Sequence, residues 1–437
     1  VLENNIQQQQ QPRMSNNGGT QQQPSNIKEM IATGKVDNLI FNPGSMLDQG
    51  RPSQLPPKSQ EEIAKHQREY EEIQKKAKKT LEKEAKEKEK QDQVRKEKEK
   101  SLIDARRVWE DDIIPNWDPK KKDPGIMKRI REVSWRGLPP AVRGKVWKMA
   151  VGNDLRITND LFTISLGHAN NALLAFNRNN RVTSPKHNDD DDSPPRRKHS
   201  LNGKSVLKDS DDFDNEDVLG VESTSLGLIL QDIQDTFPSL MIFQKSGPLH
   251  NDLIDVLGAY ICNRPDIGYV PGMTFLGAMF LLNMEKYDAF QCLSNHINKN
   301  CFLAFFRQDQ SGIPKYLNAM DATVEAMLPK LHKHFKDVGI SAKHYLVDWI
   351  TTLFSKTLPL DIATRIWDLT FLEGEIFVYR TSLAILRLFI ADLESATYDQ
   401  CIDLFTQLPQ RKIQEDQFFD EVASIVLDQR KFDKLLE

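Results

Sequence analysis

The sequence predicts an all-α protein, in which a multi-helix domain is preceded by a disordered tail and a charged helix. From about residue 226 to the end of the chain, apolar residues recur every three or four positions, which is the spacing of one face of an amphipathic helix. Proline and glycine punctuate these stretches, for example at Pro265, Gly272, Pro314 and Pro359. No segment keeps the two-residue alternation of a half-buried strand. We therefore expect helices and no sheet.

The first 59 residues predict a disordered tail. They are rich in Gln, Asn, Ser and Pro, include a glutamine run from Gln7 to Gln11, and contain few apolar residues spaced to form a face. Only 39% of all residues are hydrophobic and the mean hydropathy is −0.55. This composition indicates that part of the chain does not pack into a core. We expect this tail to act mainly as a spacer.

Residues 60–107 predict a solvated helix of high charge. Between residues 61 and 100, 26 of the 40 residues are charged and neither proline nor glycine occurs, so nothing there interrupts a helix. Glutamate repeatedly precedes lysine by four positions, which adds about 0.2–0.5 kcal/mol per pair to a solvated helix. The pairs are Glu61–Lys65, Glu71–Lys75, Glu72–Lys76, Glu82–Lys86 and Glu84–Lys88. Ile63, Tyr70 and Ala77 are spaced by seven, but the apolar seam then fails, so a lone helix is favoured over a weak coiled coil.

A single helical domain is expected over residues 108–437, interrupted by a disordered insertion at about residues 180–219. The insertion contains the acidic run Asp189–Asp192, the pair Pro194-Pro195 and a second acidic cluster, and such a segment cannot bury an apolar face. Beyond it, helical patterns cover about 248–262, 272–284, 286–300, 314–333, 342–355, 359–370, 376–392 and 397–407.

Composition and motifs exclude several classes of function. The net charge of −4 argues against general nucleic-acid binding, and no apolar run reaches the roughly 18 residues of a transmembrane helix. Neither a phosphate-binding G-x-x-x-x-G-K-[ST] loop nor a G-x-S-x-G element occurs. His332 and His334 are two residues apart, so they point to different sides of a helix, and the cysteines lack the spacing of metal ligands. We expect no metal, no cofactor and four reduced cysteines, namely Cys262, Cys292, Cys301 and Cys401.

Four motif blocks follow one another through the domain. The first, around Trp135, Gly137, Pro139-Pro140 and Trp147, predicts a turn, a helix start and large core residues. The other three blocks, taken singly, also fit helix ends, turns and core positions. They run from Ile229 to Pro238, from Arg264 to Met273 and from Tyr345 to Arg380. A purely structural interpretation does not explain why all four occur in this order.

Together the four blocks resemble the TBC domain, the GTPase-activating module for Rab GTPases, over about residues 109–437. They are most similar to the subgroup of TBC family members twelve and fourteen. In the family the second block reads I-x-x-D-x-x-R, and its arginine enters the Rab active site. The third block reads Y-x-Q-G, and its glutamine positions the attacking water. Such an arginine stabilises the charge that develops on the γ-phosphate and is worth about 10³–10⁵ in rate.

This chain departs from the family at both catalytic positions. Asp235 stands where the family has arginine, and Pro271 stands where it has glutamine. A carboxylate repels a triphosphate, and proline has neither an amide side chain nor an N–H to hold a water. The rest of the two motifs is kept, at Ile229, Asp232, Tyr269 and Gly272. By resemblance, the residues expected to face the partner are Asp232, Thr236, Phe237, Tyr269, Gly272 and Met273.

The resemblance and the two departures predict a regulator of Rab-type small GTPases in membrane trafficking. Such a regulator is not itself an enzyme, and this one is expected to bind Rab with impaired GTPase activation. Two alternatives stay open: an active GTPase-activating protein that uses Arg264 or Lys245 instead, and a trafficking scaffold that no longer binds Rabs. The tail and the charged helix are expected to contact membrane-tethering or adaptor proteins. Reduced cysteines and a Rab partner point to the cytoplasm, with peripheral recruitment to endomembranes.

Overall fold

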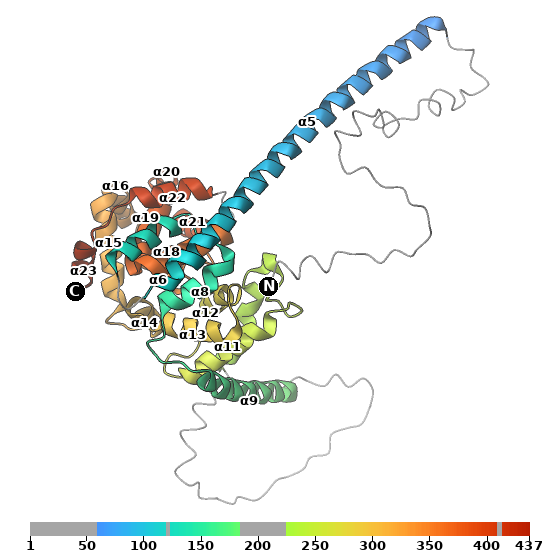
Figure 1. The fold of residues 1–437 in the computed structure, drawn as a ribbon. Coiled ribbons are helices and arrows are strands. Elements are labelled where there is room, and N and C mark those ends of the chain that lie inside the picture. The colour runs from blue at the N-terminus through green and yellow to red at the C-terminus, as the bar shows by residue number, and fades with distance from the viewer. Residues whose placement is uncertain (1–58, 119–122, 184–223, 409–412) are drawn as a thin grey trace, which may run out of the picture. The chain divides into compact units, whose positions relative to one another are not determined.

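The structure is a computed structural model that describes residues 59–118, 123–183, 224–408 and 413–437 (Figure 1). The disordered tail and all but the first four residues of the insertion, both expected from the sequence, lie outside the described residues. Within the described ranges every regular element is a helix, which confirms the all-α fold class. None of these helices is long and apolar enough to cross a membrane. The chain divides into two units, Val1–Leu102 and Ile103–Glu437.

The charged segment forms one long helix, α5 (Gln60–Arg107), which confirms the helix expected there. Ion pairs one turn apart lie along it, such as Lys65 with Glu69 at 4.0 Å and Asp92 with Arg95 at 3.2 Å. Three of its large apolar residues are exposed, namely Ile73, Leu102 and Ile103, with 54%, 42% and 48% of their surface accessible. Because α5 buries so little apolar surface, its stability depends on helix propensity and charge pairing.

The second unit consists of helices of very different length. Its N-terminal elements are η1 (Val108–Ile113, a π-helix), α6 (Ile114–Asn116), α7 (Pro124–Ser134), α8 (Pro140–Val151) and α9 (Asn159–Thr183). After a helix at residues 224–232 follow η2 (Ile233–Asp235), η3 (Pro238–Leu240), α11 (His250–Asn263), α12 (Met273–Leu281), α13 (Lys286–Ile297), α14 (Asn300–Phe306), α15 (Ile313–Met327) and α16 (Pro329–Val338). The C-terminal elements are η4 (Ala342–His344), α17 (Leu346–Thr351), α18 (Leu360–Glu373), α19 (Glu375–Leu388), α20 (Ile390–Leu393), α21 (Tyr398–Gln407), α22 (Glu415–Ser424) and α23 (Gln429–Leu436).

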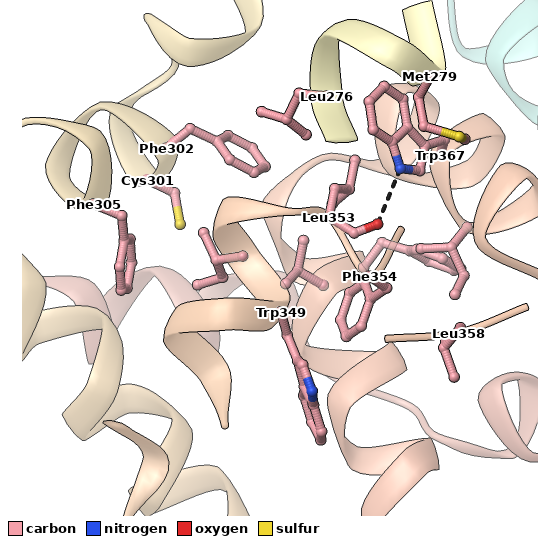
Figure 2. Packing of buried hydrophobic residues seen from close by; sticks show 14 of the residues in the cluster. Leu276, Met279, Cys301, Phe302, Phe305, Trp349, Leu353, Phe354, Leu358 and Trp367 are labelled. Atoms are coloured by element: carbon pink, nitrogen blue, oxygen red, sulfur yellow. Dashed lines mark hydrogen bonds between the residues drawn. The ribbon is translucent and has the colours of Figure 1, made fainter. Parts of the chain in front are cut away.

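Large aromatic side chains fill the core between the first and fourth motif blocks. The ring centroid of Trp147 on α8 lies 5.3 Å from that of Trp367 on α18 and 5.4 Å from that of Phe371. Both indoles are fully buried. The indole N–H of Trp367 donates to the carbonyl of Leu353 at 3.0 Å, as Figure 2 shows. Rings of this size each bury 150–250 Å² and contribute much of the hydrophobic stabilisation, about 1.5–3 kcal/mol apiece.

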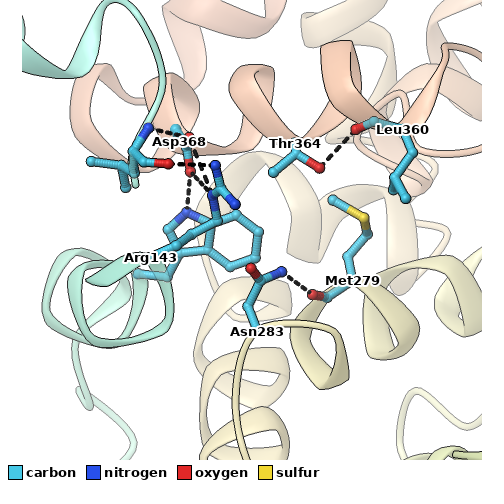
Figure 3. Close-up of polar contacts among 8 residues, drawn as sticks. Arg143, Met279, Asn283, Leu360, Thr364 and Asp368 are labelled. Atoms are coloured by element: carbon cyan, nitrogen blue, oxygen red, sulfur yellow. Dashed lines mark hydrogen bonds and ion pairs between the residues drawn. The ribbon is translucent and has the colours of Figure 1, made fainter. Parts of the chain in front are cut away.

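A buried carboxylate joins the same two blocks. Asp368 on α18 is fully buried and accepts hydrogen bonds from the backbone N–H of Leu138 at 2.8 Å, from the indole of Trp147 at 2.7 Å and from Nε of Arg143 at 3.1 Å (Figure 3). The expected turn and helix start of the first block are confirmed, since Gly137 has a φ of 89° and α8 begins at Pro140. The first block therefore supplies the three hydrogen-bond donors, and α18 supplies the carboxylate that accepts from them.

Several of the sequence-based helix boundaries are wrong, and two of them have a clear local cause. The range 314–333 forms two helices, because Leu328 precedes a proline and leaves the helical region, with φ −133° and ψ 58°. The range 342–355 holds only the short η4 and α17. After α17 the backbone turns through Leu353 and Phe354, both with positive φ, at 44° and 62°. Burial of both side chains and the bond from Trp367 hold this conformation in place.

Candidate functional site

The second motif block ends in a tight turn that displays Asp235. Residues 224–232 are helical and tighten into the 3-10 turn η2. Ile229 and Ile233, four positions apart, are fully buried and fix which face of this segment packs against the core. Asp235 is the last residue of η2 and its side chain is exposed. Asp235 is thus an accessible carboxylate at the end of this turn.

Thr236 and Phe237 support this turn from inside the domain. The Thr236 hydroxyl donates to the carbonyl of Asp232 at 2.9 Å, and the side-chain amide of Gln244 donates to the carbonyl of Thr236 at 3.2 Å. Phe237 has a left-handed backbone, with φ 45° and ψ 58°, and its ring packs edge-on against Phe275 with centroids 5.2 Å apart. Thr236 is fully buried and Phe237 is 9% exposed, so both act as support for the turn rather than as an accessible surface.

The third block forms the loop between α11 and α12 and displays Pro271. Pro271 is exposed, whereas Met273, which opens α12, is fully buried. Gly272 between them has a φ of 101°, which side chains with a Cβ rarely adopt. A Cβ at this position would also lie 3.1 Å from Cγ2 of Thr352 and 3.2 Å from the carbonyl oxygen of Thr351. The glycine is therefore needed both for its backbone angle and for this close approach.

A hydrogen bond between side chains joins the two blocks. The hydroxyl of Tyr269 donates to Oδ2 of Asp232 at 2.6 Å. The backbone N–H of Tyr269 also points to Oγ of Ser225, at 3.4 Å. Burial, followed by the neighbouring Asp232 carboxylate, raises the pKa of Tyr269 well above its usual value of 10, so the phenol stays protonated and remains a donor. Asp232 and Tyr269, both expected at the site, are thus brought together.

The two cations that the sequence analysis left open as alternatives, Arg264 and Lys245, differ in their surroundings. Arg264 donates through Nε and Nη2 to both oxygens of Asp266, at 2.8 and 2.9 Å, and its side chain is only 18% exposed. Arg307 donates to the same carboxylate at 2.7 Å. The Arg264 guanidinium, followed by that of Arg307, holds the pKa of Asp266 well below its usual range. Lys245 is exposed, and within the described ranges it has no carboxylate at ion-pair distance.

Three residues that hold the site were not expected there from the sequence. Ser225 and Arg307 contact the third block from 44 and 41 positions away in the chain, and Thr352 packs against Gly272. Ser225 and Arg307 are ordinary polar residues outside the motif blocks, whereas Thr352 lies in the fourth block, which predicted no contact with the third. Only the three-dimensional fold shows that they belong to the site.

Histidines and cysteines form no cluster at this site. His332 lies 3.7 Å from the carboxylate of Glu325, and His334 lies 2.8 Å from the carbonyl oxygen of Ala396. All four cysteines are free. Among the described residues, no group of three potential metal ligands comes together.

Comparison with known proteins finds relatives along most of the chain. The Rab-GTPase-TBC domain family matches residues 140–393. Drainin of Dictyostelium discoideum is 68% identical over 425 residues, which cover 95% of this chain and 95% of that protein. TBC1 domain family member 14 of Bos taurus is 38% identical over 396 residues, covering 90% of this chain and 53% of that protein. TBC1 domain family member 12 of Mus musculus is 41% identical over 381 residues, covering 87% and 50%. The chain spans about half the length of these two mammalian relatives.

Solved structures show the same fold. The TBC domain of the Chlamydomonas flagellar RabGAP matches with a TM-score of 0.52 and 18% identity, covering 74% of this chain and 93% of that one. The Ypt/Rab-GAP domain of Gyp1p matches with a TM-score of 0.50 and 15% identity, covering 74% and 96%. At such low identity these likenesses concern the fold alone. The family match covers more than half of the chain and several relatives exceed 30% identity, so this chain belongs to the Rab-GTPase-TBC domain family.

Proposed function

We propose that this chain is a regulator of membrane trafficking that binds a Rab-type GTPase without accelerating its GTP hydrolysis. One observation carries the proposal. The 2.6 Å hydrogen bond from Tyr269 to Asp232 joins the two segments that hold the catalytic groups of the family, and those segments display Asp235 and Pro271. The framework of the site is kept, while the side chains that would act on the nucleotide are of the wrong kind.

The loss of activity follows from the charge and the hydrogen-bonding capacity of these two residues. Hydrolysis of GTP spreads negative charge over the γ-phosphate oxygens, and an arginine placed there lowers the barrier by about 4–7 kcal/mol. The exposed Asp235 carboxylate has the opposite sign and raises the energy of the same transition state. Pro271 cannot orient a water, since its side chain carries neither donor nor acceptor.

The surroundings of Arg264 favour this proposal over an activator with substitute residues. For Arg264 to act on a nucleotide, it would have to leave two charge-assisted hydrogen bonds to Asp266, at 2.8 and 2.9 Å. Only 18% of its side chain is exposed, so such a movement would also give up contacts with the protein, among them the one to Asn298. Lys245 is exposed and remains the candidate for a substitute cation.

We further propose that Rab binding recruits the protein from the cytoplasm to endomembranes. The N-terminal residues 1–107 would then contact tethering or adaptor proteins. The exposure of α5 along its length supports this part of the proposal, because a helix that buries almost none of its own surface is available to partners.

Single-turnover GTP hydrolysis over a panel of Rab GTPases tests the proposal. We expect no acceleration by the unchanged chain and a large acceleration of one Rab by the double variant Asp235→Arg, Pro271→Gln. The double variant Asp235→Asn, Pro271→Ala is the matched control, because it removes the native side chains without adding the catalytic groups. Binding of each version to GTP-loaded Rab is measured in parallel.

The other outcomes separate the alternatives. Acceleration by the unchanged chain contradicts the proposal, and its loss in Lys245→Ala would then identify the substitute cation. If no version binds any Rab, the chain is a scaffold for other proteins. Binding by the unchanged chain combined with hydrolysis only by the restored variant supports the proposal.

A further inference from the structure

The loop that carries Pro271 is held at its start by charge. The carboxylate of Asp266 lies between two guanidinium groups, with Arg264 Nε at 2.8 Å from Oδ1 and Arg307 Nη2 at 2.7 Å from Oδ2. Arg264 belongs to the same turn, since its own carbonyl accepts the N–H groups of Ile267 and Gly268, at 3.1 and 3.0 Å. The Arg264 contact is therefore internal to the loop. Arg307 is the member of the cluster that comes from elsewhere in the fold.

Arg307 is itself held in a defined position. It follows α14 directly, keeps a helical backbone with φ −77° and ψ −6°, and donates its N–H to the carbonyl of Leu303 at 2.9 Å. Phe305 and Phe306 are buried and fix this end of α14 in the core. A contact from Arg307 to the loop thus links the loop to a rigid part of the domain.

The remaining contacts hold the middle and the end of the loop. The bond from Tyr269 to Asp232 fixes the middle, and Gly272 packs against Thr351 and Thr352 at the end. Pro271 lies between these two points and is exposed. Without the Arg307 contact, the polar contacts recorded between the segment from Pro265 to Tyr269 and other helices are the bond from Arg264 to Asn298 and that from Tyr269 N–H to Ser225, beside the packing of Ile267 against the core.

We propose that Arg307 is a positioning residue that clamps the loop of residues 265–271 to α14, so that position 271 is held in a fixed place toward the partner. The function of the clamp rests on the proposed function, whereas its existence does not. Arg307 and Asp266 are 49% and 43% exposed, so solvent screens their attraction. We therefore expect the contact to slow local opening of the loop by only about threefold to fivefold, in line with exposed ion pairs.

Hydrogen exchange of the full chain tests the clamp. In Arg307→Met, the amides of residues 266–270 and 272 should exchange about threefold to fivefold faster at low salt, while those of α12 keep their rates. Arg307→Lys should restore most of the protection, because only one donor of Arg307 contacts Asp266. Arg106→Met is the matched control, since Arg106 also forms an ion pair of similar exposure, with Glu110 one turn along the same helical segment. In about 1 M salt, where the Debye length is about 3 Å, the difference between Arg307→Met and the unchanged chain should shrink.

Unchanged exchange of the loop in Arg307→Met would overturn the proposal. Equal acceleration of the loop in Arg106→Met, or acceleration that extends into α12, would also overturn it, because either result indicates general destabilisation rather than a local clamp.

A kinetic measurement then tests what the clamp is for. In the Asp235→Arg, Pro271→Gln background, adding Arg307→Met should lower the maximal rate of Rab GTP hydrolysis more than it changes the concentration for half-maximal rate, because misplacement of a catalytic group mainly affects the transition state. If the maximal rate and the concentration for half-maximal rate change by the same factor, a positioning role is contradicted. If the restored variant accelerates no Rab, the proposed function fails, while the exchange result still decides whether the clamp exists.

Discussion

Asp368 is a charged side chain in a place where charge is costly. It is fully buried, and its partner Arg143 is only 14% exposed. The carboxylate is tolerated because three donors from the first motif block satisfy it. Removal of one partner from such a pair leaves the other charge buried without compensation.

The variant Asp368→Asn should therefore be strongly destabilised. We expect the free energy of unfolding to fall by about 3 kcal/mol, because Arg143 loses its counter-charge and the amide cannot accept all three hydrogen bonds. Urea unfolding measures the change. Asp361→Asn on the same helix is the control, since Asp361 is exposed and its change should stay within about 0.5 kcal/mol. Similar losses in both variants would show that the buried contact is unimportant.

At the scale of helices, the sequence predicted most elements. Some of the predicted boundaries were wrong, for reasons that are local to each. The start of α8 at Pro140 was predictable from proline at the first helical turn. The break at Leu328 was equally encoded, by the proline that follows, but the apolar pattern continues through it. The end of α17 was not predictable, because Leu353 and Phe354 adopt positive φ only under the packing that surrounds them.

Two glycines inside helices show how packing overrides helix propensity. A Cβ on Gly144 of α8 would lie 2.1 Å from the carbonyl oxygen of Asn283, whereas a Cβ on Gly167 of α9 would meet no atom within 4 Å. Gly144→Ala should destabilise the domain by about 1–3 kcal/mol, since a backbone atom must move. Gly167→Ala should stabilise it by about 0.5–1 kcal/mol through helix propensity. Thermal unfolding of the two variants, compared with the unchanged chain, should give shifts of opposite sign; shifts of the same sign would contradict this account.

At the scale of the whole molecule, the sequence predicted the fold class and the residue types at the site but not its support. Asp235 and Pro271 were identified by their place in two short motifs, and the structure finds both exposed. The contacts of Ser225 and Arg307 were not predictable, because they depend on how distant helices pack and follow no periodicity. The bond between Tyr269 and Asp232 lies between these cases, since both residues were recognised but their contact was not.

The stability of the whole domain should depend on pH through His296. This side chain is buried beside Phe302, with ring centroids 4.0 Å apart, and burial, followed by the nearby Lys299, lowers its pKa from 6.5 to about 3. As the pH falls below 6.5, the unfolded chain binds a proton that the folded chain does not. The free energy of unfolding is therefore fully present above pH 6.5 and decreases as the pH falls toward 3.

Urea unfolding at pH 7 and pH 5 measures this contribution. Between these values His296 should account for about 2 kcal/mol of the lost free energy of unfolding, and His296→Phe should lose that much less than the unchanged chain. The carboxylates titrate alike in both proteins, so the comparison isolates the histidine. An identical pH dependence in the two proteins would show that His296 has an ordinary pKa in the folded state.

The contact between Asp368 and Leu138 also limits when the domain can fold during translation. The two residues are 230 positions apart in the chain. At a synthesis rate of about 5–20 residues per second, the first block emerges from the ribosome about 12–46 s before the carboxylate that satisfies it. During that interval Arg143 and the indole of Trp147 have no Asp368 to bind. The N-terminal helices of the domain therefore cannot reach their final packing until α18 has been translated.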